Sequence, residues 1–409
     1  MPQLIIALIL CASIHEVTAL QEFAFFLSIA LGLWAFYSLS RDSAVIKTVR
    51  KRWPIFAALS LPGGYFVVAT LQETVEHTPM AIASFVGFGM LGLGMLTVAL
   101  KEDDFRPLFR FLAIGAAMIT IEGIIEMWYR TPDTGVLLSP VRWFHQGNTL
   151  HTQIRMGLGT LPWASTISAW LDVVAACTLP LISYGRGWKQ KAFWSFILFV
   201  MMVGVFFGGS RIPILAFIGI VLVYVARKPG MLRWVSTAVM AFLIAAIGLM
   251  LTMKRSLIRG DGSMRSRFQM WKLCVDLIKR NPLFGGGRNA FKYAWPAYSV
   301  QNQYGFDGYL DPHSFYFWIL TSGGLVLFGM VALAVFGAAY GFYLIQSSTL
   351  PRGTKTLSLA IALGAVAVLG MEVIGTDLRE FGMQNLAVVF LSMTTGLALR
   401  ANKGLRSTP

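Results

Sequence analysis

Residues 315–345 have the sequence FYFWILTSGGLVLFGMVALAVFGAAYGFYLI, and this stretch decides the fold class. It carries no charged side chain over 31 positions, whereas about 20 apolar residues suffice to cross the roughly 30 Å hydrocarbon layer of a membrane. Because the stretch is too long for one simple crossing, we expect Gly323 and Gly324 to separate a short first helix from the spanning one. The stretch therefore predicts a membrane-spanning helix.

Similar apolar runs recur along the whole chain, in which 56% of the residues are apolar and 13% are charged. The pattern predicts an all-α polytopic membrane protein with about twelve transmembrane helices. The first run has no preceding Lys or Arg and leads directly into the second, so we expect a retained helix and no cleaved signal peptide. The predicted spans are residues 2–19, 21–39, 53–71, 79–100, 108–128, 163–183, 192–208, 211–226, 234–252, 315–345, 355–375 and 382–400.

The short loops between these runs predict the orientation of the chain. Loops rich in Lys and Arg stay in the cytoplasm because their translocation is disfavoured. Such residues collect in every second loop and in the C-terminal tail, which predicts that both termini are cytoplasmic. The clusters lie within residues 41–52, 101–110, 186–191, 227–233, 352–355 and 400–406.

The predicted spans divide the chain into three parts. Residues 1–252 hold transmembrane helices 1–9 with a minor outer segment, 129–162, and residues 314–409 hold transmembrane helices 10–12 with the cytoplasmic tail. Between them, the large outer segment 253–313 carries ten basic residues from Lys254 to Lys292. Long loops are exempt from the charge rule, so these residues need their own explanation. Anionic lipid headgroups or a phosphorylated substrate would provide one.

The outer segment contains an amphipathic helix at residues 264–280, preceded by Ser263 as N-cap and ended by Asn281-Pro282. Arg267 falls among the apolar side chains, one turn from Trp271, where a guanidinium is costly unless an anion pairs with it or it reaches solvent. The helix is expected to lie along the membrane surface. Its predicted apolar face comprises Met264, Phe268, Trp271, Cys274, Val275 and Ile278.

Three further features point to chemistry on the outer side. Gly285, Gly286 and Gly287 allow unusual dihedral angles and close backbone approach to a ligand, and Arg288 follows them. Gly208-Gly209-Ser210 precedes Arg211 at the start of a predicted span, where a helix N-terminus favours anions. His313, in Asp311-Pro312-His313-Ser314, has a side chain that can act as a general base near neutral pH.

Other motifs are missing from the sequence. It contains no Walker-type phosphate loop, no dinucleotide fingerprint and no zinc-spaced Cys and His cluster, which argues against an ATP-driven pump. Three cysteines, an odd number, predict no structural disulfide.

The order of four features across residues 160–345 resembles the O-antigen ligase and O-antigen polymerase superfamily. These features are Gly-Gly-Ser-Arg211 opening a helix, Arg267 four residues before Trp271, the glycine-rich residues 281–287, and His313 followed by Gly323-Gly324-Leu325. The superfamily usually has Asn after the motif histidine, whereas Ser314 stands here. The resemblance implies a GT-C-like glycosyltransferase that acts on undecaprenyl-pyrophosphate-linked glycans at the periplasmic face of the bacterial inner membrane, without metal or other cofactor.

Within that superfamily the chain looks more like a ligase, because its dominant outer segment lies between helices 9 and 10. An O-antigen ligase takes part in lipopolysaccharide biosynthesis by transferring the glycan to a sugar hydroxyl of lipid A-core. Polymerases tend to have two comparable outer loops, so segment 129–162 keeps that alternative open.

The resemblance and the residues together predict the roles in the site. Arg211, Arg267 and Arg288 would bind the donor pyrophosphate, and Arg265 is a further candidate because the helical phase is uncertain near a helix start. His313 would accept the proton of the acceptor hydroxyl. Direct attack of that hydroxyl on the anomeric carbon implies inversion of the anomeric configuration. Possible substrate contacts are Arg142, His151, Arg155 and Asp311.

A transporter or flippase for a lipid-linked anion is the competing class. It would line a membrane-spanning cavity with polar groups, whereas in-span acids are few here and the outer basic residues gather at one surface. That distribution favours surface chemistry over translocation. The acids within the predicted spans include Glu122, Glu126, Asp172 and Glu372.

Overall fold

The computed structural model describes residues 1–14, 18–41, 78–102, 104–130, 164–207, 211–226, 262–287, 289–301, 312–371 and 381–403. Every regular element among them is an α-helix, so the predicted all-α fold is confirmed for this part of the chain. The helices are α1 (Pro2–Ser13), α2 (Thr18–Ser40), α5 (Thr78–Lys101), α6 (Arg106–Arg130), α9 (Ala164–Tyr184), α10 (Gly187–Phe207), α11 (Arg211–Ala226), α13 (Gly262–Arg280), α14 (Ala290–Gln301), α15 (Phe315–Ser347), α16 (Arg352–Met371) and α17 (Phe381–Lys403).

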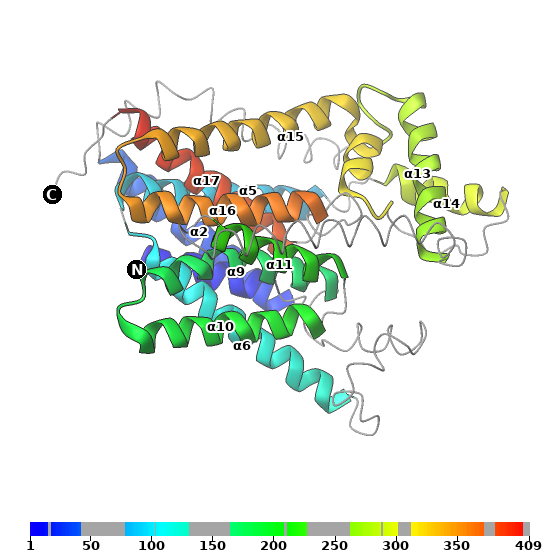
Figure 1. Cartoon of the computed structure of the whole chain (residues 1–409). Helices are drawn as coiled ribbons and strands as arrows, with labels where there is room; N and C mark the ends of the chain where they lie inside the picture. The colour runs from blue at the N-terminus through cyan, green and yellow to red at the C-terminus, as the bar shows by residue number, and fades with distance from the viewer. Residues whose placement is uncertain are drawn as a thin grey trace.

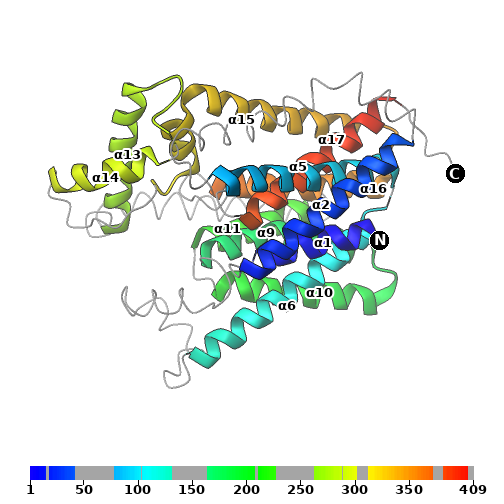
Figure 2. The ribbon, with the colours of Figure 1, turned by 180° about the vertical axis from the view of Figure 1, so that it is seen from behind.

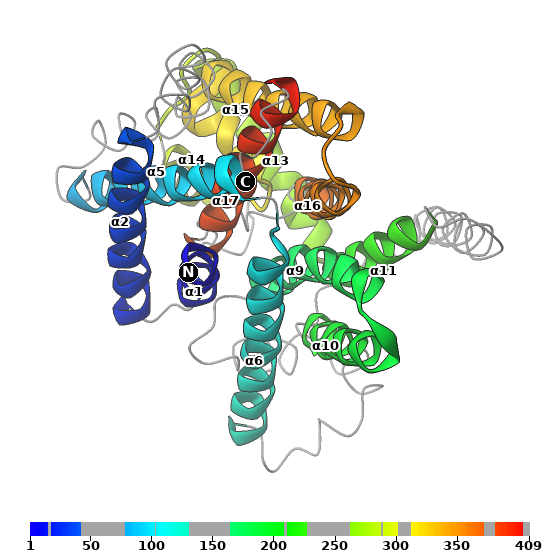
Figure 3. The same ribbon diagram turned by 90° about the vertical axis from the view of Figure 1, so that its left-hand side faces the viewer.

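Most of these helices form one bundle, and α13 crosses an end of it. Figure 1 shows α10, α15 and α16 running along the bundle while α13 runs across them, with α14 beside it. Both chain termini lie at the opposite end, as the view from behind also shows (Figure 2). Figure 3 looks along the bundle from the end that carries the termini, with α13 and α14 at the back. Helix α13 and the two termini therefore occupy opposite ends of the bundle.

Six helices of the described chain are long and apolar enough to cross a membrane, so its membrane-helix character agrees with the sequence. The predicted total of twelve stays a prediction, because spans 53–71 and 234–252 lie outside the described residues. The first span is shorter than predicted. Helix α1 ends at Ser13 instead of residue 19, and the polar pair His15-Glu16 lies just beyond it in the sequence.

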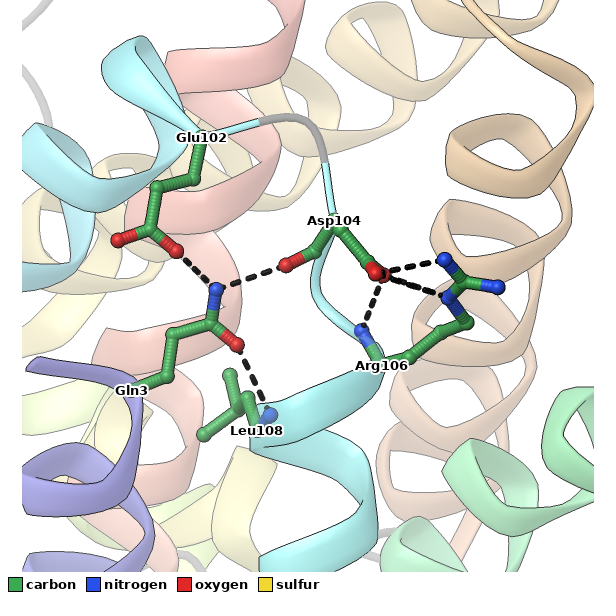
Figure 4. Close-up of polar contacts among 5 residues, drawn as sticks. All are labelled: Gln3, Glu102, Asp104, Arg106 and Leu108. Carbon is green, nitrogen blue, oxygen red and sulfur yellow. Dashed lines mark hydrogen bonds and ion pairs between the residues drawn. The ribbon is translucent and has the colours of Figure 1, made fainter. Parts of the chain in front are cut away.

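The turn between α5 and α6 is tied to the first helix (Figure 4). Gln3, which is buried, donates to the Glu102 carboxylate and to the carbonyl of Asp104 (2.7 Å), and its own oxygen accepts from the Leu108 N–H (2.9 Å). The Arg106 side chain donates to the Asp104 carboxylate, which lowers the pKa of that carboxyl against the opposing effect of partial burial. One glutamine thus joins α1 to both helices of this turn.

Helix α15 is broken at the position that its two glycines predict. Gly324 has φ of 62° and ψ of −160°, which are not helical angles, and it divides a short first part from the long second part. A Cβ atom at this position would lie 2.4 Å from the carbonyl carbon of Leu283. Only glycine therefore fits, both for its positive φ and for the approach of the other backbone.

The break is held by the loop that follows α13. The N–H groups of Gly286 and Gly287 donate to the carbonyls of Thr321 (2.8 Å) and Ser322 (3.0 Å). In the reverse direction, the N–H groups of Leu325 and Val326 donate to Pro282 (2.8 Å) and Leu283 (3.1 Å). A break in a helix leaves backbone N–H and C=O groups without intrahelical partners, and buried backbone groups need hydrogen bonds. We call these four bonds between residues 282–287 and 321–326 the glycine clasp.

The predicted close approach at the triple glycine therefore occurs, but to the backbone of α15. Gly285 and Gly287 have φ of 68° and 93°, as the prediction of unusual dihedral angles requires. A Cβ atom on Gly285 would lie 2.5 Å from the carbonyl carbon of Ser322. The close neighbour described for Gly285 is thus protein backbone, and contact of these glycines with a ligand stays a prediction.

Replacing Gly285 by Ala is expected to destabilise the protein by roughly 2 kcal/mol, because it adds both a clash and a strained φ. The measurement is thermal unfolding of the purified protein in detergent. Gly329→Ala is the matched control, since that glycine lies in α15 with no atom within 4 Å of an added Cβ. Equal melting temperatures for the two variants would contradict the role of Gly285.

Candidate active site

Helix α13 agrees closely with the predicted amphipathic helix 264–280. It spans Gly262–Arg280, and the N–H of Asn281 donates to the carbonyl of Leu277 (3.2 Å) where the helix ends. Pro282 follows and cannot continue the helix. The chain then enters the glycine clasp directly, so the end of α13 is held against the break in α15.

The packed face of α13 differs from the predicted one. Met270, Leu273 and Cys274 are buried against Phe291 and Trp295 of α14. Met270 and Leu273 lie outside the predicted face, because α14 and α15 approach the helix from a direction that its own periodicity does not specify.

Two members of the predicted apolar face are therefore exposed. Phe268 is 50% exposed and Val275 is 40% exposed, whereas Cys274 and Trp271 do belong to the packed side. The following loop adds Leu283 and Phe284, which are also exposed. The apolar surface left open on α13 is consistent with contact to a membrane, which remains a prediction.

Trp271 attaches α13 to the segment that precedes α15. Its indole N–H donates to the carbonyl of Pro312 (3.1 Å), and its ring stacks on Phe317 with 5.5 Å between centroids. Arg267 lies one turn before Trp271 and is partly buried. The hydrogen bond therefore brings the turn of α13 that carries this arginine to the backbone immediately before His313.

His313 occupies an unusual backbone conformation. It has φ of 46°, a left-handed angle at which histidine is less disfavoured than most residues, and its side chain is partly buried. Ser314 follows as the N-cap of α15, and its carbonyl accepts from the Trp318 N–H (2.9 Å). Strained conformations of this kind cost about 1–3 kcal/mol and cluster at functional sites.

A second contact fixes the short first part of α15 and has no signal in the sequence. The hydroxyl of Tyr316 donates to the carbonyl of Leu369 near the end of α16 (2.7 Å). Because Leu369 lies near the end of α16, this bond holds the first part of α15, which begins two residues after His313, against that helix. A tyrosine within an apolar run does not indicate which carbonyl its hydroxyl will bond.

The other predicted site residues are placed only in part. Arg211 is the first residue of α11, as predicted, and Arg265 lies in the first turn of α13, but the structure describes only their backbone. No group of three or more His, Cys, Asp or Glu residues in the described chain could hold a metal ion. Outside the described residues lie Arg142, His151, Arg155, Ser210, Arg288 and Asp311.

Comparison with known protein families finds a match in this part of the chain. The sequence profile of the O-antigen ligase family matches residues 196–332. These residues include most of α10, all of α11, α13 and α14, the glycine clasp, His313 and the break in α15. No curated protein matches the chain. From within α10 to within α15, the chain is therefore similar to the O-antigen ligase family.

Proposed function

We propose that the protein is an O-antigen ligase, a glycosyltransferase that moves a glycan from undecaprenyl pyrophosphate to a sugar hydroxyl of lipid A-core. The observation that carries the proposal is the Trp271–Pro312 hydrogen bond, which joins the arginine-bearing turn of α13 to the backbone before His313. Pyrophosphate binding needs fixed cations, and acceptor activation needs a base near them. The family match at residues 196–332 supports the same chemistry.

The arginines would act on the leaving group. As the bond between the anomeric carbon and the phosphate oxygen breaks, negative charge grows on the pyrophosphate. The guanidiniums of Arg211, Arg267 and Arg288 would hold its oxygens through paired hydrogen bonds. Arg265, which also lies on α13, is a further candidate for the same oxygens. Fixed guanidiniums can provide the charge stabilisation that a divalent cation supplies in other transferases.

His313 would act on the acceptor. The imidazole takes the proton of the sugar hydroxyl while the hydroxyl oxygen attacks the anomeric carbon from the side opposite the pyrophosphate. A new glycosidic bond forms, the bond to phosphate breaks, and undecaprenyl pyrophosphate leaves. A single displacement of this kind inverts the anomeric configuration. Arg142, His151, Arg155 and Asp311 are proposed as further substrate contacts.

The proposed orientation in the membrane is based on which segments lie at each end of the bundle. Residues 253–313 would face the periplasm and both termini the cytoplasm, with the helices spanning the bacterial inner membrane as in a GT-C-like transferase. The basic loops predict this orientation, and α13 lies at the end of the bundle opposite the termini, which supports it (Figure 1).

Purified protein, an undecaprenyl-pyrophosphate-linked glycan and lipid A-core, mixed in chelator without nucleotide, are expected to yield glycan-bearing lipid A-core. The products are separated by gel electrophoresis and identified by mass. Longer lipid-linked chains in place of this product would indicate a polymerase, and unchanged substrates would contradict both.

A matched pair of variants connects that transfer to the site. Arg267→Ala should reduce turnover by about 10²-fold, the usual scale for removing a charge-stabilising group. Lys272→Ala removes an exposed cation from the same helix and should leave turnover unchanged. Full activity in Arg267→Ala would show that the arginine does not contact the donor.

Removing the imidazole of His313 should lower the chemical step by roughly 10² to 10⁴ with donor affinity nearly unchanged. His313→Asn and His313→Gly are the informative variants, because both residues tolerate the positive φ that Ala would strain. Single-turnover rates and donor binding separate the two effects. Activity of the parent protein should also fall at acidic pH, since an imidazolium cannot accept a proton. A normal single-turnover rate with lost donor binding would make His313 a pyrophosphate ligand instead.

A further inference from the structure

Asp172 is a carboxylic acid inside the bundle that the reaction above does not use. It lies in α9, a helix that is buried at every position from Thr166 to Leu181. Asp172 itself is 0% exposed, and within the described part of the chain neither of its carboxylate oxygens has a hydrogen-bond partner. Burying an ionisable residue inside a membrane-spanning helix costs free energy, and such residues usually have a function. A buried carboxylate of this kind needs a polar or cationic partner.

The neighbours of Asp172 along α9 show which way it faces. Ala176, Leu179 and Ser183 follow it at helical spacing and share its stripe. Ala176 and Leu179 pack against Ile220 and Tyr224 of α11, and the hydroxyls of Ser183 and Tyr224 lie 2.9 Å apart. Asp172 is therefore on the face of α9 that meets α11.

The same contact sets the level of Asp172 along α11. Because α10 returns between them, α9 and α11 run in the same direction, and Ser183 pairs with a residue 41 positions later. That offset carries Asp172 to Pro213, the third residue of α11, which is buried. This offset puts Asp172 at the level of the first turn of α11, which is the positive end of that helix and carries N–H groups without intrahelical partners.

The first turn of α11 also begins with Arg211. Leu198 of α10 and Leu363 and Ala367 of α16 complete the packing around this face. Within α10, α11 and α16 as described, the other Lys and Arg residues lie in the first turns of α10 and α16, at the far end of the bundle: Tyr184, the last residue of α9, donates to the carbonyl of Arg352 (3.4 Å). Arg211 is therefore the cationic residue of these three helices at the level of Asp172.

We propose that Asp172 is a positioning residue whose carboxylate orients the guanidinium of Arg211 toward the donor pyrophosphate; the inference rests on the donor-binding role proposed for Arg211. A fixed counter-charge behind an arginine reduces its rotamer freedom, so less entropy is lost when the pyrophosphate binds. A carboxylate inside the bundle is also shielded from water, which strengthens its effect on a nearby cation.

The test is a double-mutant cycle on donor binding, with undecaprenyl pyrophosphate in detergent micelles as the probe. Asp172→Asn, which keeps the shape and removes the charge, should weaken binding about tenfold. In an Arg211→Ala background the same substitution should change binding by less than about twofold, because the group that Asp172 orients is gone. Losses that multiply, or an unchanged Kd in Asp172→Asn, would overturn the proposal.

Two further variants separate positioning from folding. Asp172→Glu keeps the charge and should retain binding within about threefold. Thr178→Val removes another buried polar group of α9, whose hydroxyl donates to the carbonyl of Val174 (2.9 Å), and should leave binding unchanged. If Thr178→Val weakens binding as much as Asp172→Asn, the effect belongs to α9 packing and the proposal fails. A parent protein that binds the lipid but transfers no glycan would contradict the ligase function while the cycle still decides the role of Asp172.

Discussion

A helix that breaks within a membrane protein frees amide and carbonyl groups, and these must find partners away from water. In α15 the break at Gly324 frees such groups on both sides, and the loop after α13 satisfies them with four backbone hydrogen bonds. The exchange requires two backbones to meet without side chains, which is why Gly285 and Gly324 face each other's chain. The rest of the site depends on this glycine clasp.

The clasp and the Trp271 bond hold the same short helix at its two ends. The first part of α15 is attached to α13 through Pro312 at its start and through Thr321 and Ser322 at its end. The proposed leaving-group cation and the proposed base are therefore carried by one rigid unit. Catalytic groups work best when their supporting contacts fix them before the substrate arrives, so this unit fits the chemistry proposed for it.

Several features could be predicted because they depend on local sequence. The uncharged run at 315–345, the break at its two glycines and the stop of α13 at Asn281-Pro282 all follow from composition and backbone restrictions. The orientation of α13 could not be predicted as well, since Phe268 and Val275 are exposed while Met270 and Leu273 are buried. Periodicity gives the faces of a helix, but the direction from which α14 and α15 approach is a tertiary property.

The hydrogen-bond partners of the glycines could not be predicted either, because the local sequence at residues 285–287 does not indicate that the carbonyls of Thr321 and Ser322 are the acceptors. Hydrogen exchange measured across residues 284–290 and 323–328 tests the clasp most directly. The account predicts that the amides of Gly286, Gly287, Leu325 and Val326 exchange slowly and become fast together when Gly285 is replaced by Ala. Rapid exchange of these four amides in the parent protein, at rates typical of an exposed loop, would contradict it.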